Sequence, residues 1–312
     1  MSTVLPVDTP PEPRTQPWVL HILHVNTMNF CSFAQLEIKT SDLETESEDE
    51  LLIAVPNTMS SETVSSTFTT SSPHSLTTSQ VDIFHLPSSK RLHTVPGNNS
   101  VKGGMVMAVS MFHHPQTSQL TVIAGYESGH TVVSRLSPTY SWQVLYTAQP
   151  HTQPILSLDI SALRDFYLTS SADATIAKHP IPIVAETLRP TIESLPLKTL
   201  QTKHSGQQSL RIRNDGKVFA TAGWDSKVRV YATKSLKELG VLKWHKEGCY
   251  SVAFADVKDE TPEGEASGDI GGELVKKSTE MTVKQERLWK AKTAHWLAVG
   301  SKDAKVSLWD IY

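Results

Sequence analysis

The stretch that decides the fold reads Gly300-Ser301-Lys302-Asp303-Ala304-Lys305-Val306-Ser307-Leu308-Trp309-Asp310-Ile311. A second stretch upstream repeats its pattern as Gly223-Trp224-Asp225-Ser226-Lys227-Val228-Arg229-Val230-Tyr231. In both, a turn rich in Gly or Ser carries an aspartate six residues before an aromatic residue on an alternating strand. Self-similarity of this kind predicts a repeat architecture, with each unit built from short antiparallel strands.

The unit around Asp225 is the clearest copy of this repeat. It contains four strand-like runs separated by turn residues, at Ser209 to Arg213, Val218 to Ala222, Lys227 to Ala232 and Gly240 to Trp244. Four strands in roughly 40 residues is the size of one blade of a WD-repeat β-propeller. The chain divides into five such blades, namely 26–100, 101–150, 151–204, 205–245 and 246–312. We therefore predict an all-β, WD-repeat propeller with five visible blades.

Segments of biased composition lie outside the predicted strands. Residues 1–17 form a Pro-rich leader, whereas residues 40–50 are acidic and residues 57–80 are rich in Ser and Thr. A further insert at 256–292 is acidic first and then basic. These compositions predict disorder. The inserts are either tolerated insertions at a blade edge or regulated docking and phosphorylation sites.

The last predicted blade has no fourth strand, because its third strand is followed at once by Tyr312. The run Trp18 to Val25 alternates like a strand and stands directly before the first blade. Propellers usually leave no open blade edge. Two interpretations follow: this run closes a five-bladed ring, or it is the outer strand of a preceding blade.

Aspartates and histidines recur at matching places in the predicted blades. A turn aspartate, a histidine before the first strand of a blade, a hydroxyl and a strand aromatic can form a buried hydrogen-bond network. The residues expected in such networks are Asp173, Asp225, Asp303, His151, His204, His245, Tyr231 and Trp309. A catalytic Ser/His/Asp triad has a similar composition, but it needs an exposed nucleophile beside an oxyanion site. Because these residues recur from blade to blade, we expect a structural role and no catalytic residues.

Composition argues against several functional classes. Lys and Arg total 29 against 32 Asp and Glu, which gives no electrostatic case for direct binding of nucleic acid or of an anionic membrane. Cys31 and Cys249 lack the spacing of a metal site, and no phosphate-binding loop is present. Neither a signal peptide nor a membrane-spanning run is found. We expect a soluble intracellular protein without metal or cofactor.

Several strings are more specific than the repeat. They are Gln16-Pro17-Trp18, the run Val25 to Phe33, the run Gly223 to Tyr231 and the run Leu239 to Phe254. Together they resemble the ASTRA-associated protein 1 family of fungi. Its members are WD-repeat proteins similar to the animal guanine nucleotide-binding protein β-subunit-like protein 1, and the resemblance covers nearly the whole chain.

This resemblance implies a nuclear, non-enzymatic scaffold subunit of the ASTRA complex, linked to chromatin remodelling and to the maturation of phosphatidylinositol-3-kinase-like kinases. The implied partners are RuvB-like ATPases, kinase co-chaperone proteins and a phosphatidylinositol-3-kinase-like protein. The family also implies a seven-bladed ring with two blades before the Gln-Pro-Trp string. On that basis we expect an N-terminally incomplete ring in this chain, with residues 18–25 as an outer strand.

The alternative function is a WD-repeat substrate adaptor of a ubiquitin ligase. Such an adaptor would read an acidic or phosphorylated segment with arginines gathered on the central face of the ring. The candidate arginines are scattered over three predicted blades, at Arg135, Arg211, Arg213 and Arg229. A propeller enzyme would need a convergent pocket of titratable groups, which the sequence does not display.

Overall fold

The computed structural model describes residues 19–23, 25, 30–38, 50–57, 80–97, 103–183, 192–257 and 294–311. All regular structure in these residues is β-strand. The strands form five antiparallel sheets, and each sheet is a meander in which strands consecutive in sequence pair with one another. Within the described ranges no helix is long and apolar enough to span a membrane.

The sheets follow one another in chain order. The first contains β1 (Ala34–Ile38), β2 (Glu50–Pro56), β3 (Val81–Leu86) and β4 (Lys90–Val95). The second contains β5 (Val106–His113), β6 (Leu120–Tyr126), β7 (Thr131–Leu136) and β8 (Trp142–Ala148). The third contains β9 (Ile155–Ile160), β10 (Phe166–Ser171), β11 (Thr175–Pro180) and β12 (Lys198–Gln201). The fourth contains β13 (Gln207–Ile212), β14 (Val218–Gly223), β15 (Lys227–Ala232) and β16 (Glu238–Lys243). The fifth contains β17 (Cys249–Phe254), β18 (Trp296–Ser301) and β19 (Val306–Asp310).

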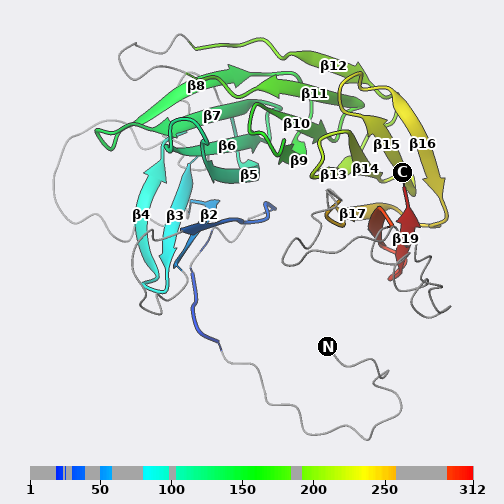
Figure 1. Ribbon diagram of the computed structural model, residues 1–312, viewed down its shortest axis with the longest axis horizontal. Helices are drawn as coiled ribbons and strands as arrows, with labels where there is room; N and C mark the ends of the chain where they lie inside the picture. Colours follow the sequence, from blue (N-terminus) through cyan, green and yellow to red (C-terminus); the bar gives the residue numbers. More distant parts are fainter. Residues whose placement is uncertain are drawn as a thin grey trace, which may run out of the picture.

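The five sheets stand side by side around an arc (Figure 1). The first strand of each sheet lies on the inner side of the arc, and the inner strands β1, β5, β9, β13 and β17 pack on one another in that order. Outer strands such as β8, β12 and β16 lie on the outside (Figure 1). This is a β-propeller-like arrangement.

The second strand of several sheets shows why the sheets stack. In β6 and β14 every residue is buried, because a neighbouring sheet covers each face. Such strands read as short continuous apolar runs in the sequence, LTVIAGY and VFATAG, with no alternation. Apolar clusters between neighbouring sheets form the core, as where Val228 and Val230 of the fourth sheet meet Val252 of the fifth.

The run Trp18 to Val25, expected as an outer strand, is described only in part. Residues 19–23 and Val25 are described without any strand pairing, and Val19, Leu20 and Ile22 are exposed. Alternation alone does not make a strand, because the backbone N–H and C=O groups also need a neighbouring strand to pair with. The described sheets do not supply one.

The ends of the predicted inserts also differ. Glu50, predicted as the end of an acidic insert, begins β2. Asn57, predicted as the start of the Ser/Thr-rich insert, is buried and donates to both carboxylate oxygens of Asp82 at 3.0 Å. These residues are therefore part of the first sheet. The rest of these inserts (40–49 and 58–79), the Pro-rich leader (1–17) and residues 258–292 of the third insert lie outside the described residues.

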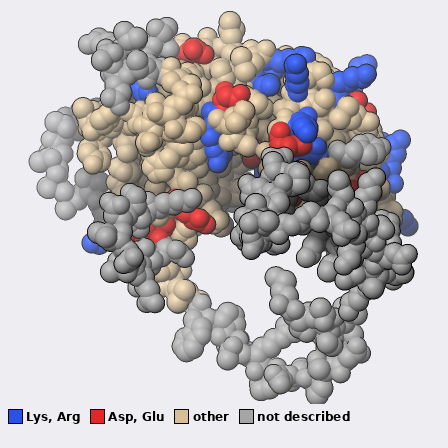
Figure 2. Space-filling model, in the orientation of Figure 1, with Lys and Arg blue, Asp and Glu red and all other residues tan. Residues whose placement is uncertain are grey.

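Positive charge is distributed unevenly over the arc. In Figure 2, Lys and Arg side chains gather over the part formed by β12 to β19, whereas few appear over the part formed by β3 to β8. On the face seen in Figure 2, the two parts of the arc share one architecture and differ in the number of exposed Lys and Arg side chains.

Candidate functional site

The turn between β10 and β11 holds one of the expected aspartates, Asp173. Its carboxylate accepts hydrogen bonds from Thr175 N at 2.8 Å and Thr152 N at 2.9 Å, and lies 3.2 Å from Nδ1 of His151. Burial on its own raises the pKa of Asp173, but these hydrogen bonds outweigh it and hold the pKa below its usual value. The carboxylate therefore fixes the turn to the loop that leads into β9.

A buried chain of hydrogen bonds continues from His151. Its Nε2 lies 2.8 Å from Oγ1 of Thr169, which lies 2.9 Å from Nε2 of His179. Nδ1 of His179 is 2.8 Å from the hydroxyl of Tyr146 on β8. Burial, with a smaller contribution from the charge of His151, lowers the pKa of His179 to about 3. The chain therefore runs through a neutral imidazole and links the third sheet to the second.

The fifth sheet has a shorter network around Asp303. His245 lies with Nδ1 3.2 Å from Oδ2 of Asp303 and with Nε2 2.9 Å from Oγ of Ser307. Trp309 donates its indole N–H to the same hydroxyl at 2.8 Å. The hydroxyl here comes from the third strand of the sheet, and Val299 occupies the place on β18 that Thr169 has on β10.

The fourth sheet departs from this pattern at Asp225. Arg229 on β15 binds its carboxylate through two hydrogen bonds, at 2.6 and 3.2 Å. The expected partner His204 stands 4.0 Å away and its side chain is 41% exposed. Tyr231 is buried and stacked on Phe219, with ring centroids 5.0 Å apart. The structure therefore places His204 at the edge of this network, and an arginine takes the main role.

Arg229 is not expected in a network from the sequence, where it is one of four arginines scattered over three predicted blades. Its side chain is 2% exposed, between the buried strand residues Val228 and Val230. A charged residue inside a buried apolar run, four positions after the turn aspartate, is the signal that identifies it, because such a charge needs a partner. Arg213 is paired in a similar way with Asp215, at 2.7 Å.

The groups in these networks are already bonded to one another, which limits the reactions they could support. The imidazoles of His151 and His245 each have a carboxylate on one nitrogen and a hydroxyl on the other. Nucleophilic catalysis needs a nucleophile exposed beside an oxyanion site, which neither arrangement provides. In the described ranges no group of three or more His, Cys, Asp or Glu side chains could hold a metal ion.

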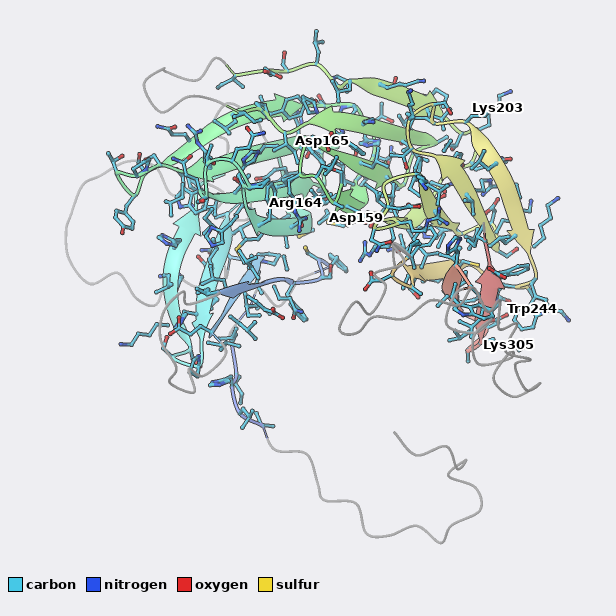
Figure 3. The ribbon with its side chains drawn as sticks, viewed as in Figure 1. Asp159, Arg164, Asp165, Lys203, Trp244 and Lys305 are labelled. Carbon is cyan, nitrogen blue, oxygen red and sulfur yellow. The ribbon has the colours of Figure 1, made fainter. Side chains whose placement is uncertain are left out.

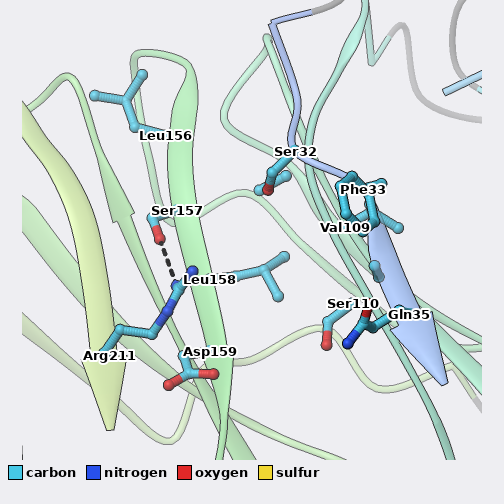
Figure 4. A pocket seen from close by; sticks show the side chains of 12 residues that line it. Ser32, Phe33, Gln35, Val109, Ser110, Leu156, Ser157, Leu158, Asp159 and Arg211 are labelled. Carbon is cyan, nitrogen blue, oxygen red and sulfur yellow. Dashed lines mark hydrogen bonds between the residues drawn. The ribbon is translucent and has the colours of Figure 1, made fainter. Parts of the chain in front are cut away.

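A hollow of about 230 Å³ lies on the inner side of the arc, between β1, β5, β9 and β13 (Figure 4). Asp159 on β9 faces inward (Figure 3), and Arg211 on β13 lies opposite it. Burial raises the pKa of Asp159, although a hydrogen bond from Ile212 N and the charge of Arg211 act in the other direction. Ser32, Gln35 and Ser110 complete the polar lining.

The polar groups beside this hollow join neighbouring sheets. Ile212 N donates to Asp159 at 2.7 Å, and Leu210 N donates to Ser157 Oγ at 3.1 Å, so both bonds run from β13 to β9. Ser209 occupies on β13 the place that Ser157 has on β9, and it accepts a bond from Val252 N on β17 at 3.4 Å. The inner strands are thus held together by side chains bonded to backbone.

Comparison with known proteins identifies relatives over the whole chain. Residues 195–232 match the family model described as WD domain, G-beta repeat. A protein of Verticillium alfalfae named ASTRA-associated protein 1 is 47% identical over all of this chain and 71% of its own length. Proteins of the same name from Aspergillus flavus and Schizosaccharomyces japonicus are 43% and 30% identical, over 100% and 94% of this chain and 76% and 66% of their own lengths.

Proposed function

Since the chain belongs to the ASTRA-associated protein 1 family, we propose that it is a non-enzymatic scaffold subunit of the ASTRA complex. The observation that carries this proposal is that three aspartates form hydrogen bonds that join loops and sheets. Asp173 holds the loop at His151, Asp303 holds the loop at His245, and Asp159 joins β9 to β13. A rigid set of sheets that fixes many loops is suited to binding several proteins at once.

The proposed role is in chromatin remodelling and in the maturation of phosphatidylinositol-3-kinase-like kinases, in the nucleus. The partners we propose are RuvB-like ATPases, kinase co-chaperone proteins and a phosphatidylinositol-3-kinase-like protein. What supports these proposals is the name of the relatives together with the WD repeat, since proteins with this repeat commonly act by binding other proteins.

Affinity purification of the tagged chain from its own cells, followed by mass spectrometry, tests the scaffold function. We expect the RuvB-like ATPases and the kinase co-chaperones to be recovered. The tagged Arg229→Leu variant serves as a comparison. In it the fourth sheet loses the guanidinium bound to Asp225, and the recovery of other proteins should fall. Recovery of neither class of protein by the unaltered chain would contradict the proposal. Fluorescence microscopy of the tagged chain tests the nuclear location.

We also propose that the five sheets are blades of a propeller whose complete form has seven blades. What supports this is the regular packing of each inner strand on the next and the repetition of the inter-sheet serines Ser157 and Ser209. Sedimentation and thermal melting of the purified chain test this proposal. A compact monomer that melts in one cooperative step would show that the five sheets form a stable unit by themselves, and would contradict it.

The alternative of a ubiquitin-ligase adaptor gains no support from the arginines. Arg211 faces the inner hollow, but Arg213 and Arg229 are bonded to Asp215 and Asp225. Arg135 is buried and donates to Gln143. The described residues therefore gather no arginine cluster on the inner side of the arc.

A further inference from the structure

Three exposed aromatic side chains lie at one end of the fourth and fifth sheets. Trp224 follows the end of β14, Trp244 follows the end of β16 and Tyr250 lies at the start of β17. The sheets are antiparallel, so these strand ends are all on the same side of the arc. The exposed fractions of the three side chains are 46%, 54% and 45%.

Contacts with small residues hold these aromatics in place. Gly206, with φ at +73°, lies directly under the indole of Trp224, and the indole N–H donates to Oε1 of Gln208 at 2.8 Å. A Cβ on Gly248 would lie 3.2 Å from the ring of Tyr250 and 3.3 Å from Cα of Trp224. Gly248 therefore lies between the backbone of Trp224 and the ring of Tyr250, and the hydrogen bond to Gln208 orients the indole of Trp224.

The repeat itself does not require aromatic residues at these positions. The residue before the turn aspartate is Trp224 in the fourth sheet and Ala172 in the third. The residue before the network histidine is likewise Trp244 in one case and Pro150 in another. Tyr250, at the start of its inner strand, corresponds to Leu156. Because the third sheet folds with smaller residues at these places, the three aromatics are available for binding.

Exposed lysines surround the aromatics on the same loops. In the part of the chain that the structure describes, these side chains form no ion pair: Lys203, Lys246, Lys302 and Lys305. Lys305 Nζ lies 5.7 Å from the ring centroid of Trp244, and Figure 3 shows the two side by side. Two carboxylates of these loops are bonded within the fold, since Asp225 binds Arg229 and Asp303 lies against His245, whereas Glu247 is exposed. We call these four lysines with the three aromatics the aromatic–lysine face.

We propose that the aromatic–lysine face binds an acidic, extended peptide segment of a partner protein, with an apolar side chain of that segment packed against Trp224 and Tyr250. Charge complementarity supports this occupant, because unpaired lysines attract carboxylates and aromatic side chains supply the buried contact area. The inference deepens the scaffold function and rests on it. It assigns the partner-binding role to one side of the fourth and fifth sheets.

Single-stranded nucleic acid is the competing ligand for a surface of aromatics and lysines. One observation favours the peptide. Arginines suit phosphates best, and those of the fourth sheet are engaged elsewhere: Arg213 and Arg229 are bonded to Asp215 and Asp225, and Arg211 faces the inner hollow.

Fluorescence anisotropy with the purified full chain tests this proposal. The probe is a fluorescein-labelled dodecapeptide of Asp and Glu with a central Phe-Leu pair, compared with a Lys-containing version and with an oligothymidine of similar length. We expect saturable binding of the acidic peptide that weakens about tenfold in Trp224→Ala and that loses much of its salt dependence in Lys302→Ala/Lys305→Thr. Lys234→Ala, at the opposite end of the fourth sheet, is the matched control and should bind normally.

The variants copy residues that the third sheet already carries, since Ala172 corresponds to Trp224 and Thr175 to Lys305. Tyr250→Leu, which copies Leu156, serves as a second aromatic variant should Trp224→Ala melt below the unaltered chain. No saturable binding, equal weakening by Lys234→Ala, or tighter binding of oligothymidine would overturn the proposal. Recovery of ASTRA subunits by the tagged chain is measured separately, so failure of the peptide alone leaves the scaffold function standing.

Discussion

The third and fourth sheets hold the same turn carboxylate by different means. Asp173 lies against the imidazole of His151, which comes from the connection between the second and third sheets. Asp225 instead binds the guanidinium of Arg229, which comes from β15 of its own sheet. The histidine connects sheets, whereas the arginine acts within its own sheet, where its Nε also lies 3.7 Å from Glu238 on β16.

This difference shows what the repeat requires. The carboxylate needs a buried donor, but neither the residue type nor its place in the chain is fixed. Where the donor is a histidine on the connection, its second nitrogen is free to continue the network to Thr169, His179 and Tyr146. Where the donor is Arg229, the histidine at the equivalent place, His204, stays exposed. The hydrogen bonds of the turn aspartate therefore link the third sheet to the second, whereas in the fourth sheet they stay within one sheet.

The largest effect is expected from Arg229→Leu. It leaves the carboxylate of Asp225 without its guanidinium, and removing one partner of a largely buried pair costs about 3 kcal/mol of unfolding free energy. Urea unfolding followed by circular dichroism measures the loss. Arg229→Leu/Asp225→Leu is the matched double variant, and we expect it to recover most of the stability. A single variant as stable as the unaltered chain would contradict the role assigned to this pair.

A smaller effect is expected from Thr169→Val, which removes the hydroxyl between two buried imidazoles. The unfolding free energy should fall by about 2 kcal/mol, because both imidazoles lose a partner. Thr169 pairs across the sheet with Ala177 just as Val299 pairs with Ser307. Thr169→Val/Ala177→Ser therefore copies the fifth sheet and should restore part of the loss in the same urea titration. A double variant less stable than Thr169→Val would show that the two arrangements are not interchangeable.

The pH dependence of stability should distinguish the two sheets further. The pKa of His179 is about 3 in the folded chain against an ordinary value of 6.5, so between these limits the unfolded chain binds a proton that the folded chain does not. Stability is then fully present above pH 6.5 and falls as the pH drops towards 3, by up to about 1.4 kcal/mol per pH unit for this group. The pKa of Asp173 is also lowered, so its contribution to stability is lost only as the pH falls below its ordinary pKa of 3.8. Both groups therefore make the chain less stable in acid.

Urea titrations at several pH values measure this slope in the unaltered chain and in His179→Phe. The slope should be shallower in the variant, whatever its absolute stability. His204→Ala is the control, since its exposed imidazole lies outside the buried chain. Equal slopes in all three proteins would show that His179 takes up its proton as readily in the folded chain as in the unfolded one.

The smallest effect is expected from His204→Ala, which should change the unfolding free energy by less than about 0.5 kcal/mol because the imidazole is exposed and 4.0 Å from Asp225. The equivalent substitution in the third sheet, His151→Ala, removes a buried partner of Asp173 and Thr169 and should cost several times more. If the two substitutions cost the same, the contrast between the sheets is wrong.

Much of the fold can be predicted from the sequence because each strand is a short β-branched or alternating run between turn residues. The runs at 218–222 and 227–232 match β14 and β15 closely. The exposed strand β12 (Lys198–Gln201) is not predicted, since it has four residues and no buried face. The run Trp18 to Val25 has the alternation of a strand, but its described residues, 19–23 and Val25, pair with none of the described sheets.

The networks are harder to predict than the strands, because partners are chosen in space. The position shortly before the first strand of a blade identifies His151 and His245, which lie against Asp173 and Asp303. The same position points to His204, although the guanidinium beside Asp225 comes from Arg229. The position in the sequence indicates where a hydrogen-bond donor is needed, while packing decides which side chain supplies it.

The bonds from Leu210 N to Ser157 and from Ile212 N to Asp159 have a consequence for solubility. An inner strand has a free edge, and its unpaired N–H groups could template pairing with a strand of another molecule. Along β13 those donors are already occupied by side chains of the neighbouring sheet. Ser157 and Asp159 thus occupy N–H groups at the edge of β13, and they protect the inner side of the arc from edge-to-edge aggregation.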